Sequence, residues 1–405
     1  MTLDPSNPPY PRMRYCKRCV YPQISVNLLV DDEGICSACR TAEDMDALTP
    51  AQWAHRETLF LRQLEAARKH REGDYDCVIG VSGGKDSYYQ VDVVRQAGFK
   101  PLLVTYHGNN YLPEGQGNLD RMRHVTGCDH VILGPNVDTL IRLNRLAFHM
   151  MGDMNWHCHA GIVMTPMRLA IQWKIPLVVW GEIAWDVAGM YSPDDMVEWS
   201  KRTSLEHAMR GFTWKDFVGK EGLTEQDLVW LKMPSDEAFE HVRGIYVGNF
   251  FKWEANEHVR LVTEKYGFEA ARQPFERTYR TFSNLDDMHE NGVHDYLKFL
   301  KFGYGRGSDH ASKDIRGGYM TRAQGIEMVR RYDHVKPRRD LERWLAYVGM
   351  TEAEFDRVAD TFRDKRVWAR GADGQWVKDN IWDFDTREGG FDGIIDINPV
   401  QLAKG

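Results

Sequence analysis

The stretch IGVSGGKDS (residues 79–87) decides the fold that this sequence predicts. It overlaps the end of an apolar run, YDCVIGV (75–81), whose length and Val/Ile content are typical of a buried strand. It leads into DSYYQVDVVRQAGF, where apolar residues recur at helical spacing and Gly98 stands where a helix would end. A strand, a glycine-rich turn and a helix in this order present backbone N–H groups and the positive end of a helix dipole to an anion, most often a phosphate. A turn without a ligand is the alternative, which the polar side chains crowded there disfavour: Ser82, Lys85, Asp86 and Ser87.

The composition is that of an ordinary soluble globular protein. The chain has 405 residues, 42% hydrophobic and 27% charged, which is enough for roughly two to three domains. A net charge of −7 argues against non-specific binding to nucleic acid or to a membrane surface. The first residues lack the apolar core of a signal peptide, and no apolar run approaches the roughly 20 residues of a membrane span. We therefore expect a cytoplasmic protein.

Two cysteine pairs near the N-terminus predict a metal site. CKRC (16–19) and CSAC (36–39) each supply two thiolates from one tight turn, and two such turns complete a tetrahedral site. We expect a structural zinc ion bound by Cys16, Cys19, Cys36 and Cys39. An iron–sulfur cluster is the alternative, and four unrelated cysteines are disfavoured by the spacing. The metal would supply most of the folding energy of so small a module.

Strands and helices alternate through the middle of the chain. Strand patterns at 75–81, 101–107, 130–134 and 175–181 are separated by helical patterns, which predicts an α/β fold with a doubly wound parallel sheet. Ligands bind such sheets beyond the carboxyl ends of the strands, where the glycine turn, His107 and Glu182 fall. Past Glu182 the strand pattern stops, and mostly helical signals follow. We expect a zinc knuckle over 1–50, an ATP-binding α/β domain over 51–189, and a helical substrate-binding region with a C-terminal tail over 190–405.

The glycine-rich turn differs from two common nucleotide loops. A kinase-like Walker A loop and a dinucleotide GxGxxG loop both need a spacing that is missing here. VSGGKDS (81–87) instead resembles the SGGxDS loop of the PP-loop ATP pyrophosphatases, such as the synthetase domains of asparagine, GMP and NAD synthetases and the tRNA-thiolating enzymes. The resemblance implies cleavage of ATP between its α and β phosphates and adenylation of a carbonyl oxygen.

The residues of the turn suit this chemistry. The hydroxyls of Ser82 and Ser87 and the amides of Gly83 and Gly84 can hold the leaving pyrophosphate, and Lys85 can neutralise its charge. Asp86 is the expected Mg²⁺ ligand, because a carboxylate together with phosphates usually holds this ion. A helix N-cap is the alternative role for Asp86. His107, at the end of the second strand, is a further candidate for contact with ATP.

The cysteine pairs combined with SGGKDS resemble the N-acetyl sugar amidotransferases of the WbpG/PseA type. WHCHAG (156–161), IPLVVWGE (175–182) and the block SNLDDMHENGVHDYLKFLKFGYGRGSDHASKDIRGGYMTR (283–322) carry the rest of the likeness. The resemblance implies that ATP activates the N-acetyl group of a nucleotide-linked sugar and that ammonia displaces AMP to give an acetamidino sugar. Such products belong to bacterial lipopolysaccharide O-antigen or flagellin glycan pathways.

The source of the ammonia is not evident in this chain. A glutaminase needs an activated cysteine, either N-terminal or in a Gly-x-Cys-x-Gly elbow. Residue 2 is Thr, and Cys77, Cys128 and Cys158 lack the elbow. We therefore expect a separate glutaminase partner, related to the HisH/HisF pair. A homo-oligomer is compatible with the sequence, which identifies neither the sugar nor its nucleotide.

Charged and imidazole side chains supply the remaining candidates. His157 and His159 flank Cys158 and could line the site, pack in the core or bind metal. Glu182 could contact substrate or a second Mg²⁺, or could be a helix N-terminal charge. Candidates for catalysis in the 283–322 block are His294, Lys301, Arg306 and Lys313, and candidates for substrate binding are Asp286, Asp287, His289, Lys298, Asp309, His310 and Arg316. For each one a structural ion pair is the alternative.

Two other functions share these motifs. A PP-loop sulfurtransferase acting on tRNA or a metabolite would pair a reactive cysteine, such as Cys158, with the loop. A non-catalytic nucleotide-binding scaffold would not need the intact SGGKDS sequence. The amidotransferase is the hypothesis that we carry forward.

Overall fold

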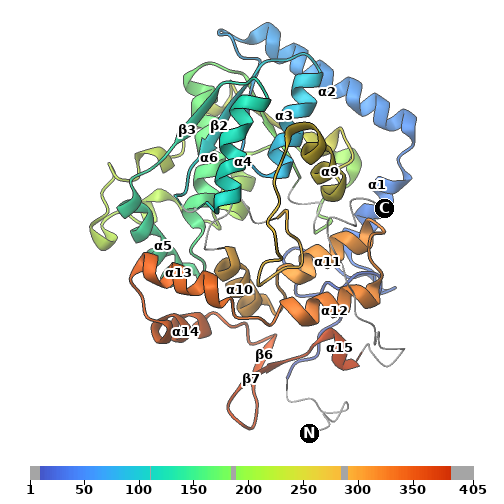
Figure 1. The fold of residues 1–405 in the computed structure, drawn as a ribbon, viewed down its shortest axis with the longest axis vertical. Helices are drawn as coiled ribbons and strands as arrows, with labels where there is room; N and C mark the ends of the chain where they lie inside the picture. Colours follow the sequence, from blue (N-terminus) through green and yellow to red (C-terminus); the bar gives the residue numbers. More distant parts are fainter. Residues whose placement is uncertain (1–9, 110, 184–187, 284–290, 385–405) are drawn as a thin grey trace.

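A five-stranded parallel sheet forms the framework of the upper part of the molecule as drawn in Figure 1. The computed structural model describes residues 10–109, 111–183, 188–283 and 291–384. The strands lie in the order β3-β2-β1-β4-β5, so β1 is central and the chain crosses back over it between β3 and β4. Their bounds are β1 Cys77–Gly80, β2 Pro101–Tyr106, β3 His130–Leu133, β4 Leu177–Trp180 and β5 Arg243–Tyr246. The predicted doubly wound parallel sheet is confirmed.

Helices cover both faces of this sheet, because alternate residues of its strands point to opposite sides. Ile79 of β1 packs in one core with residues of α3 and α9, whereas Val78 packs in another with Met167 of α6. The helices that connect or cover the strands are α3 Lys85–Gln96, α4 Pro113–Val125, α5 Val137–Met151, α6 Trp156–Gln172 and α9 Ala255–Tyr266.

The expectation that the strand pattern stops after Glu182 is wrong. β5 pairs with β4 in parallel, with Val178 opposite Gly244 and Val179 opposite Ile245. Its sequence, RGIY, is too short and too polar at its start to show a strand pattern. The described part of the segment between β4 and α9 contains only short helical pieces. The longest is the continuous run of α7 Lys201–Thr203 and η2 Ser204–Ala208, and the others are η1 Pro193–Asp195, η3 Trp214–Asp216, η4 Lys220–Gly222, η5 Val229–Leu231, α8 Asp236–Phe239 and η6 Val247–Asn249. The predicted domain boundaries stay predictions, although β5 lies beyond residue 189.

A helical layer lies across the carboxyl edge of the sheet (Figure 1). Its core contains Leu297, Leu341, Trp344 and Phe355. The helical character predicted for the C-terminal region is confirmed in this layer. The layer consists of α10 Asn291–Phe302, α11 Arg306–Arg316, α12 Arg322–Tyr332, α13 Arg338–Val348 and α14 Glu352–Thr361, followed by the antiparallel hairpin β6 Trp368–Arg370 and β7 Trp376–Lys378 and by α15 Ile381–Phe384.

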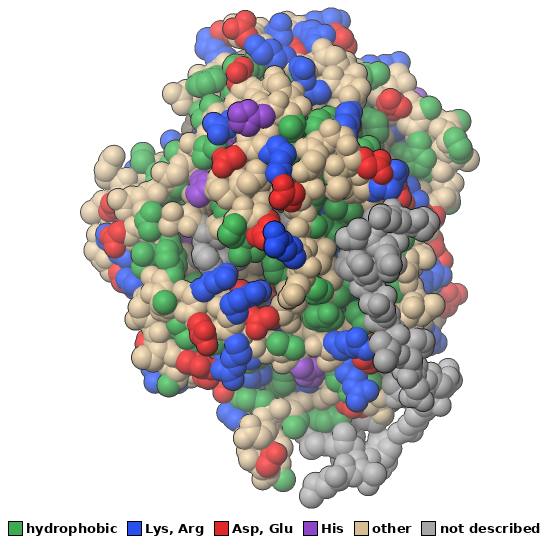
Figure 2. Space-filling view, in the orientation of Figure 1, with side chains coloured by type: hydrophobic (Ala, Val, Ile, Leu, Met, Phe, Trp, Pro, Cys, Tyr) green, Lys and Arg blue, Asp and Glu red, His purple; other side chains and the backbone are tan. Residues whose placement is uncertain are grey.

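The N-terminal part adds α1 Ser37–Ala47 and α2 Pro50–His70. α2 begins at a capping box of Thr49 and Gln52, and its Phe60 and Leu64 pack into the sheet core. Positive and negative side chains are interspersed on the face shown in Figure 2. No helix within the described ranges has the length and apolar character needed to cross a bilayer.

Candidate active site

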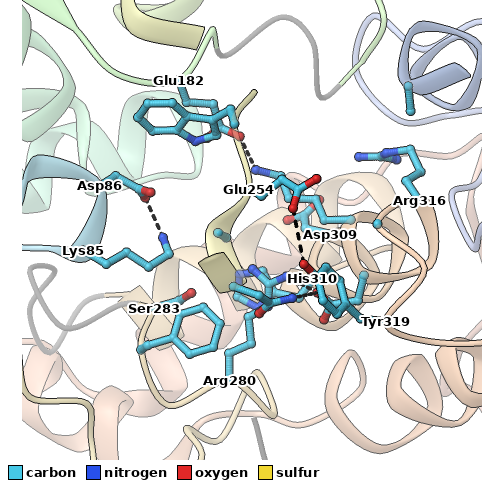
Figure 3. Close-up of a pocket in the computed structure, with 18 of the residues that line it drawn as sticks. Lys85, Asp86, Glu182, Glu254, Arg280, Ser283, Asp309, His310, Arg316 and Tyr319 are labelled. Carbon is cyan, nitrogen blue, oxygen red and sulfur yellow. Dashed lines mark hydrogen bonds and ion pairs between the residues drawn. The ribbon is translucent and has the colours of Figure 1, made fainter. Parts of the chain in front are cut away.

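A cavity of about 610 Å³ lies between the glycine-rich loop and the helical layer (Figure 3). Its walls include the loop after β1, one face of α1, the segment that leads into α9 and one face of α11. Residues after β4, in the segment 280–283 and on α10 complete the lining. The predicted site residues among its lining are Ser82, Gly84, Lys85, Asp86, Glu182, Lys298, Arg306, Asp309, His310, Lys313 and Arg316. The structure therefore brings together residues that the sequence separates by more than 200 positions.

The loop geometry depends on glycine and on two serines. Gly83 has φ +83°, and a Cβ atom there would lie 2.7 Å from the backbone nitrogen of Leu119, so only glycine fits. The Ser87 hydroxyl accepts a hydrogen bond of 3.0 Å from the Ser82 amide, and the two hydroxyl oxygens are 3.2 Å apart. α3 then begins at Lys85 with Gly84 as its N-cap. Asp86 is therefore not the N-cap, and that alternative is wrong.

The Asp86 carboxylate lies between the ammonium group of Lys85 and the imidazole ring of His258. Lys85 Nζ is 2.5 Å from Asp86 Oδ2, and His258 Nδ1 is 3.1 Å from Oδ1. Burial would raise the pKa of the Asp86 carboxyl, but the charge of Lys85 and the hydrogen bond from His258 hold it well below its usual value. The carboxylate is thus ionised and faces the cavity, which fits a Mg²⁺ ligand.

His258, on α9, is a residue that the sequence did not suggest. It is only 2% exposed, and its ring stacks on Tyr89 with the centroids 3.7 Å apart. Its second nitrogen, Nε2, is buried and has no hydrogen-bond partner within the described part of the chain. The stack fixes the ring plane, so that Nδ1 points at Asp86. An isolated histidine at helical spacing carries no sequence signal for this role.

One face of α11 lines the cavity with charged and imidazole side chains. Arg306, His310 and Lys313 recur at helical spacing on this face. Lys313 forms an ion pair with Glu182 at the end of β4, which links the sheet to the helical layer. Lys298 Nζ lies 2.6 Å from Asp309 Oδ2. Glu182 is therefore a partner of a pocket lysine.

A buried network supports the same wall. Asp314 is 1% exposed and forms an ion pair of 2.5 Å with Arg280, which also lines the cavity. The Tyr279 hydroxyl donates a hydrogen bond to the same carboxylate, and Asn256 Nδ2 lies 3.3 Å from it. Arg280 and Asn256 are pocket residues that the sequence analysis missed, because they lie outside the 283–322 block.

Replacing Asp314 with Asn is expected to destabilise the protein by about 3 kcal/mol, because it leaves Arg280 buried without its counter-charge. Urea unfolding measures the change. The matched control is Glu264→Gln on α9, where an exposed ion pair with Arg260 is lost and a change below about 0.5 kcal/mol is expected. Equal effects of the two substitutions would contradict this account of the network.

Three predicted residues gather around a different buried carboxylate. His294 Nδ1 lies 2.9 Å from Asp153 Oδ1, and Lys301 Nζ lies 4.0 Å from Oδ2. Arg210 also forms an ion pair with Asp153, and the ring of His159 lies 5.8 Å from that of His294. Burial lowers the pKa of Lys301 to about 8, although Asp153 acts in the opposite direction. None of these residues lines the described cavity wall, so their predicted catalytic and binding roles stay predictions.

The remaining predicted residues lie in the core, outside the cavity lining, or outside the described ranges. His157 is fully buried, 3.0 Å from the Tyr106 hydroxyl and 2.9 Å from Asn144 Nδ2, which is the core-packing alternative. Its predicted substrate contact is therefore corrected. His107 bonds to Gln116 at 3.0 Å and is not in the cavity lining. Asp286, Asp287 and His289 fall outside the described residues.

The cysteine pairs meet as predicted. The Sγ atoms of Cys16, Cys19, Cys36 and Cys39 all lie within 4.8 Å of one another, and all four residues are buried. Two of the Sγ–Sγ distances are 3.9 and 3.6 Å, close to the spacing of about 3.8 Å expected for tetrahedral zinc–sulfur bonds. The donor set fits a structural metal ion.

One comparison with known proteins finds a family match in the C-terminal part of the chain. Residues 276–381 match the family model "LPS biosynthesis protein WbpG-like, C-terminal domain", which confirms the resemblance to the WbpG/PseA type for that region. No curated protein sequence matches significantly.

Two solved structures show low overall similarity to this chain. One is the NMN synthetase from Francisella tularensis, at 16% identity and a TM-score of 0.28, covering 47% of this chain and 90% of that chain. The other is the U34-tRNA thiolase NcsA from Methanococcus maripaludis with its [4Fe-4S] cluster, at 15% identity and a TM-score of 0.27, covering 80% of this chain and 89% of that chain. Likeness at this level carries no weight for the activity.

Proposed function

We propose that this protein is an ATP-dependent amidotransferase that converts the N-acetyl group of a nucleotide-linked sugar into an acetamidino group for bacterial surface glycans. One observation carries the proposal. The SGGKDS loop and the charged face of α11, which belongs to the WbpG-like region, line the same cavity. An ATP-activating loop thus faces the part of the chain that a glycan-synthesis family shares.

The reaction has two steps. The amide oxygen of the N-acetyl group attacks the α phosphorus of ATP, and the bond to the leaving pyrophosphate breaks. Ammonia then adds to the activated carbon, AMP leaves with the oxygen, and the proton released from nitrogen passes to solvent or to a base. Atoms balance: ATP and ammonia are consumed, and AMP, pyrophosphate and the acetamidino sugar form.

The loop residues have defined tasks in this scheme. Lys85 would turn from Asp86 to the leaving pyrophosphate, and Ser82 and Gly84, which line the same cavity, would donate their hydroxyl and amide groups to its oxygens. Asp86 would hold Mg²⁺, which stabilises the charge that develops on the leaving group. Burial holds the pKa of His310 well below its usual value, so this residue is neutral and bonds Thr278 at 2.5 Å. We therefore assign His310 a positioning role.

Ammonia from a separate glutaminase is part of the proposal. Cys77 and Cys128 are buried, and Cys158 is not among the described residues that line the cavity. This placement also gives no support to the sulfurtransferase alternative. If the purified protein alone released glutamate from glutamine, the partner would be unnecessary.

Mass spectrometry of nucleotide sugars tests the proposal directly. Candidate N-acetylated nucleotide sugars are incubated with the protein, ATP, Mg²⁺ and ammonium. We expect AMP, pyrophosphate and a product lighter than the substrate by the difference between an oxygen atom and an NH group. Pyrophosphate release without such a product would point to another acceptor, and no ATP cleavage with any sugar would contradict the proposal.

Replacing His258 with Phe is expected to raise the Mg²⁺ concentration for half-maximal ATP cleavage by about tenfold. A change of this size corresponds to the free energy that one hydrogen bond to a charged group contributes. Phe keeps the stack on Tyr89 but cannot donate to Asp86. His258→Asn is the control, because its amide nitrogen takes the place of Nδ1 and should restore most of the Mg²⁺ affinity. An unchanged Mg²⁺ dependence in the Phe variant would show that His258 does not position Asp86.

A further inference from the structure

Arg316 differs from the other cations that line the cavity. Each of the others has a carboxylate within ion-pair distance: Lys85 with Asp86, Lys252 with Asp46 and Glu254, Arg280 with Asp314, Lys298 with Asp309, Arg306 with Asp295, and Lys313 with Glu182. Arg316 has no carboxylate partner among the described residues, where the groups that act on its charge are Tyr21 and the thiolates of Cys19, Cys36 and Cys39. Its buried Nη1 atom also has no hydrogen-bond partner among them. A guanidinium in this state is prepared to bind an anion.

The position of Arg316 separates it from the ATP loop. Figure 3 shows Arg316 on the opposite side of the cavity from Lys85 and Asp86. The loop and its lysine already account for the phosphates of ATP in the proposed reaction. Arg316 is therefore available to a second anionic ligand.

The four-cysteine module, residues 16–39, holds this side of the cavity. The guanidinium carbon of Arg316 lies 5.7 Å from the ring centroid of Tyr21, which follows the first cysteine pair. The Tyr21 hydroxyl donates a hydrogen bond of 3.0 Å to Asp309, the partner of Lys298. The Arg322 guanidinium donates to the carbonyl oxygens of the first cysteine pair at 3.1 to 3.2 Å. The module is thus joined to the wall formed by α11.

The second cysteine pair begins α1, and α1 is itself a wall. Cys36 is the N-cap of this helix, so closing the cluster sets where the helix begins. Its cavity-lining residues are Ala38, Thr41, Ala42 and Met45, which are small or apolar apart from the Thr41 hydroxyl, and Asp46, whose carboxylate is paired with Lys252. Such a face leaves room for a flat ring beside the arginine.

We propose that Arg316 and the α1 face form the binding site for the nucleoside diphosphate part of the acceptor, so that the metal module is a specificity element of the pocket. Arg316 binds the diphosphate, and α1 packs against the adjoining nucleoside. This inference rests on the proposed function, because it assumes that the acceptor sugar is carried by a nucleotide. It adds a site distinct from that for ATP and a binding role for a module expected to be only structural.

Calorimetric titration with UDP and with GDP as probes tests the inference. Arg316→Gln is expected to weaken the binding of the preferred diphosphate by about tenfold or more, since a charged hydrogen-bond donor is lost. Ala42→Phe should weaken it similarly by filling the wall. Both variants should keep the metal content and the affinity for ATP of the unaltered protein. Arg330→Gln, an exposed arginine on α12, is the matched control and should bind as the unaltered protein does.

Several outcomes would overturn the inference. Unchanged diphosphate affinity in Arg316→Gln would remove the assigned contact. A loss of ATP affinity in its place would put Arg316 in the ATP site, and an equal loss in Arg330→Gln would show only a general effect of charge. If the unaltered protein bound neither diphosphate while still cleaving ATP, the acceptor class in the proposed function would fail first, which is a distinguishable result.

Discussion

Replacing Asp86 with Asn is expected to lower the rate of ATP cleavage by about a thousandfold or more, because the expected metal ligand and its charge are lost at the leaving pyrophosphate. The amide is nearly isosteric, so the loop fold that depends on Gly83 and Ser87 should persist. Lys85 and His258 would lose their charged partner. The free energy of unfolding would then fall slightly, because Lys85 is buried without a counter-charge. Release of pyrophosphate at saturating Mg²⁺ measures the effect.

The matched control is Asp92→Asn on the same helix. Asp92 pairs with Lys265 and does not line the cavity, so this change should leave ATP cleavage close to that of the unaltered protein. Bound metal at the cysteines should be the same in both variants. ATP cleavage retained by Asp86→Asn would mean that another residue holds Mg²⁺.

Replacing Cys19 with Ser is expected to abolish the N-terminal metal site and to lower stability strongly, since binding of a structural zinc ion contributes on the order of 10 kcal/mol to modules of this kind. Cys19 is fully buried and its Sγ lies 3.6 Å from that of Cys36. Because α1 lines the cavity, the binding of nucleotide sugars should be lost as well. Elemental analysis and thermal unfolding measure the two effects.

Cys158→Ser is the control for this substitution. Cys158 lies on α6, outside the cluster, so the variant should keep its metal and its activity. Visible absorption of the unaltered protein separates zinc from the iron–sulfur alternative, because only the cluster is coloured. A Cys19→Ser variant with full metal content and unchanged unfolding would contradict the assignment of the site.

Much of the central fold could be predicted from local patterns. The strands at 75–81, 101–107, 130–134 and 175–181 contain the observed β1 to β4, since each is a short apolar run bounded by turn residues. β5 escaped prediction because only Ile245 and Tyr246 of its four residues give an apolar signal. The tertiary environment, which pairs it with β4, supplies the missing preference.

The candidate site was predictable only in part. Arg306, His310 and Lys313 were site candidates because they lie in the 283–322 block, and the structure places all three on the face of α11 that lines the cavity. The same density of charge suggested that His294 and Lys301 belonged to this site, but they surround Asp153. A block rich in ionisable residues indicates that a site is near, without telling which side of a helix each residue occupies.

By itself, the sequence determined the features that depend on neighbours along the chain: the strand–loop–helix unit around SGGKDS, the four-cysteine site and the alternation of strands and helices. Their physical basis is local, because dihedral preferences, side-chain periodicity and ligand spacing act over a few residues. Only the tertiary structure decided which distant groups pair, such as His258 with Asp86, Lys313 with Glu182, and Tyr21 with Asp309. These pairs form when packed layers bring separate segments to one cavity, and no spacing along the chain encodes that approach.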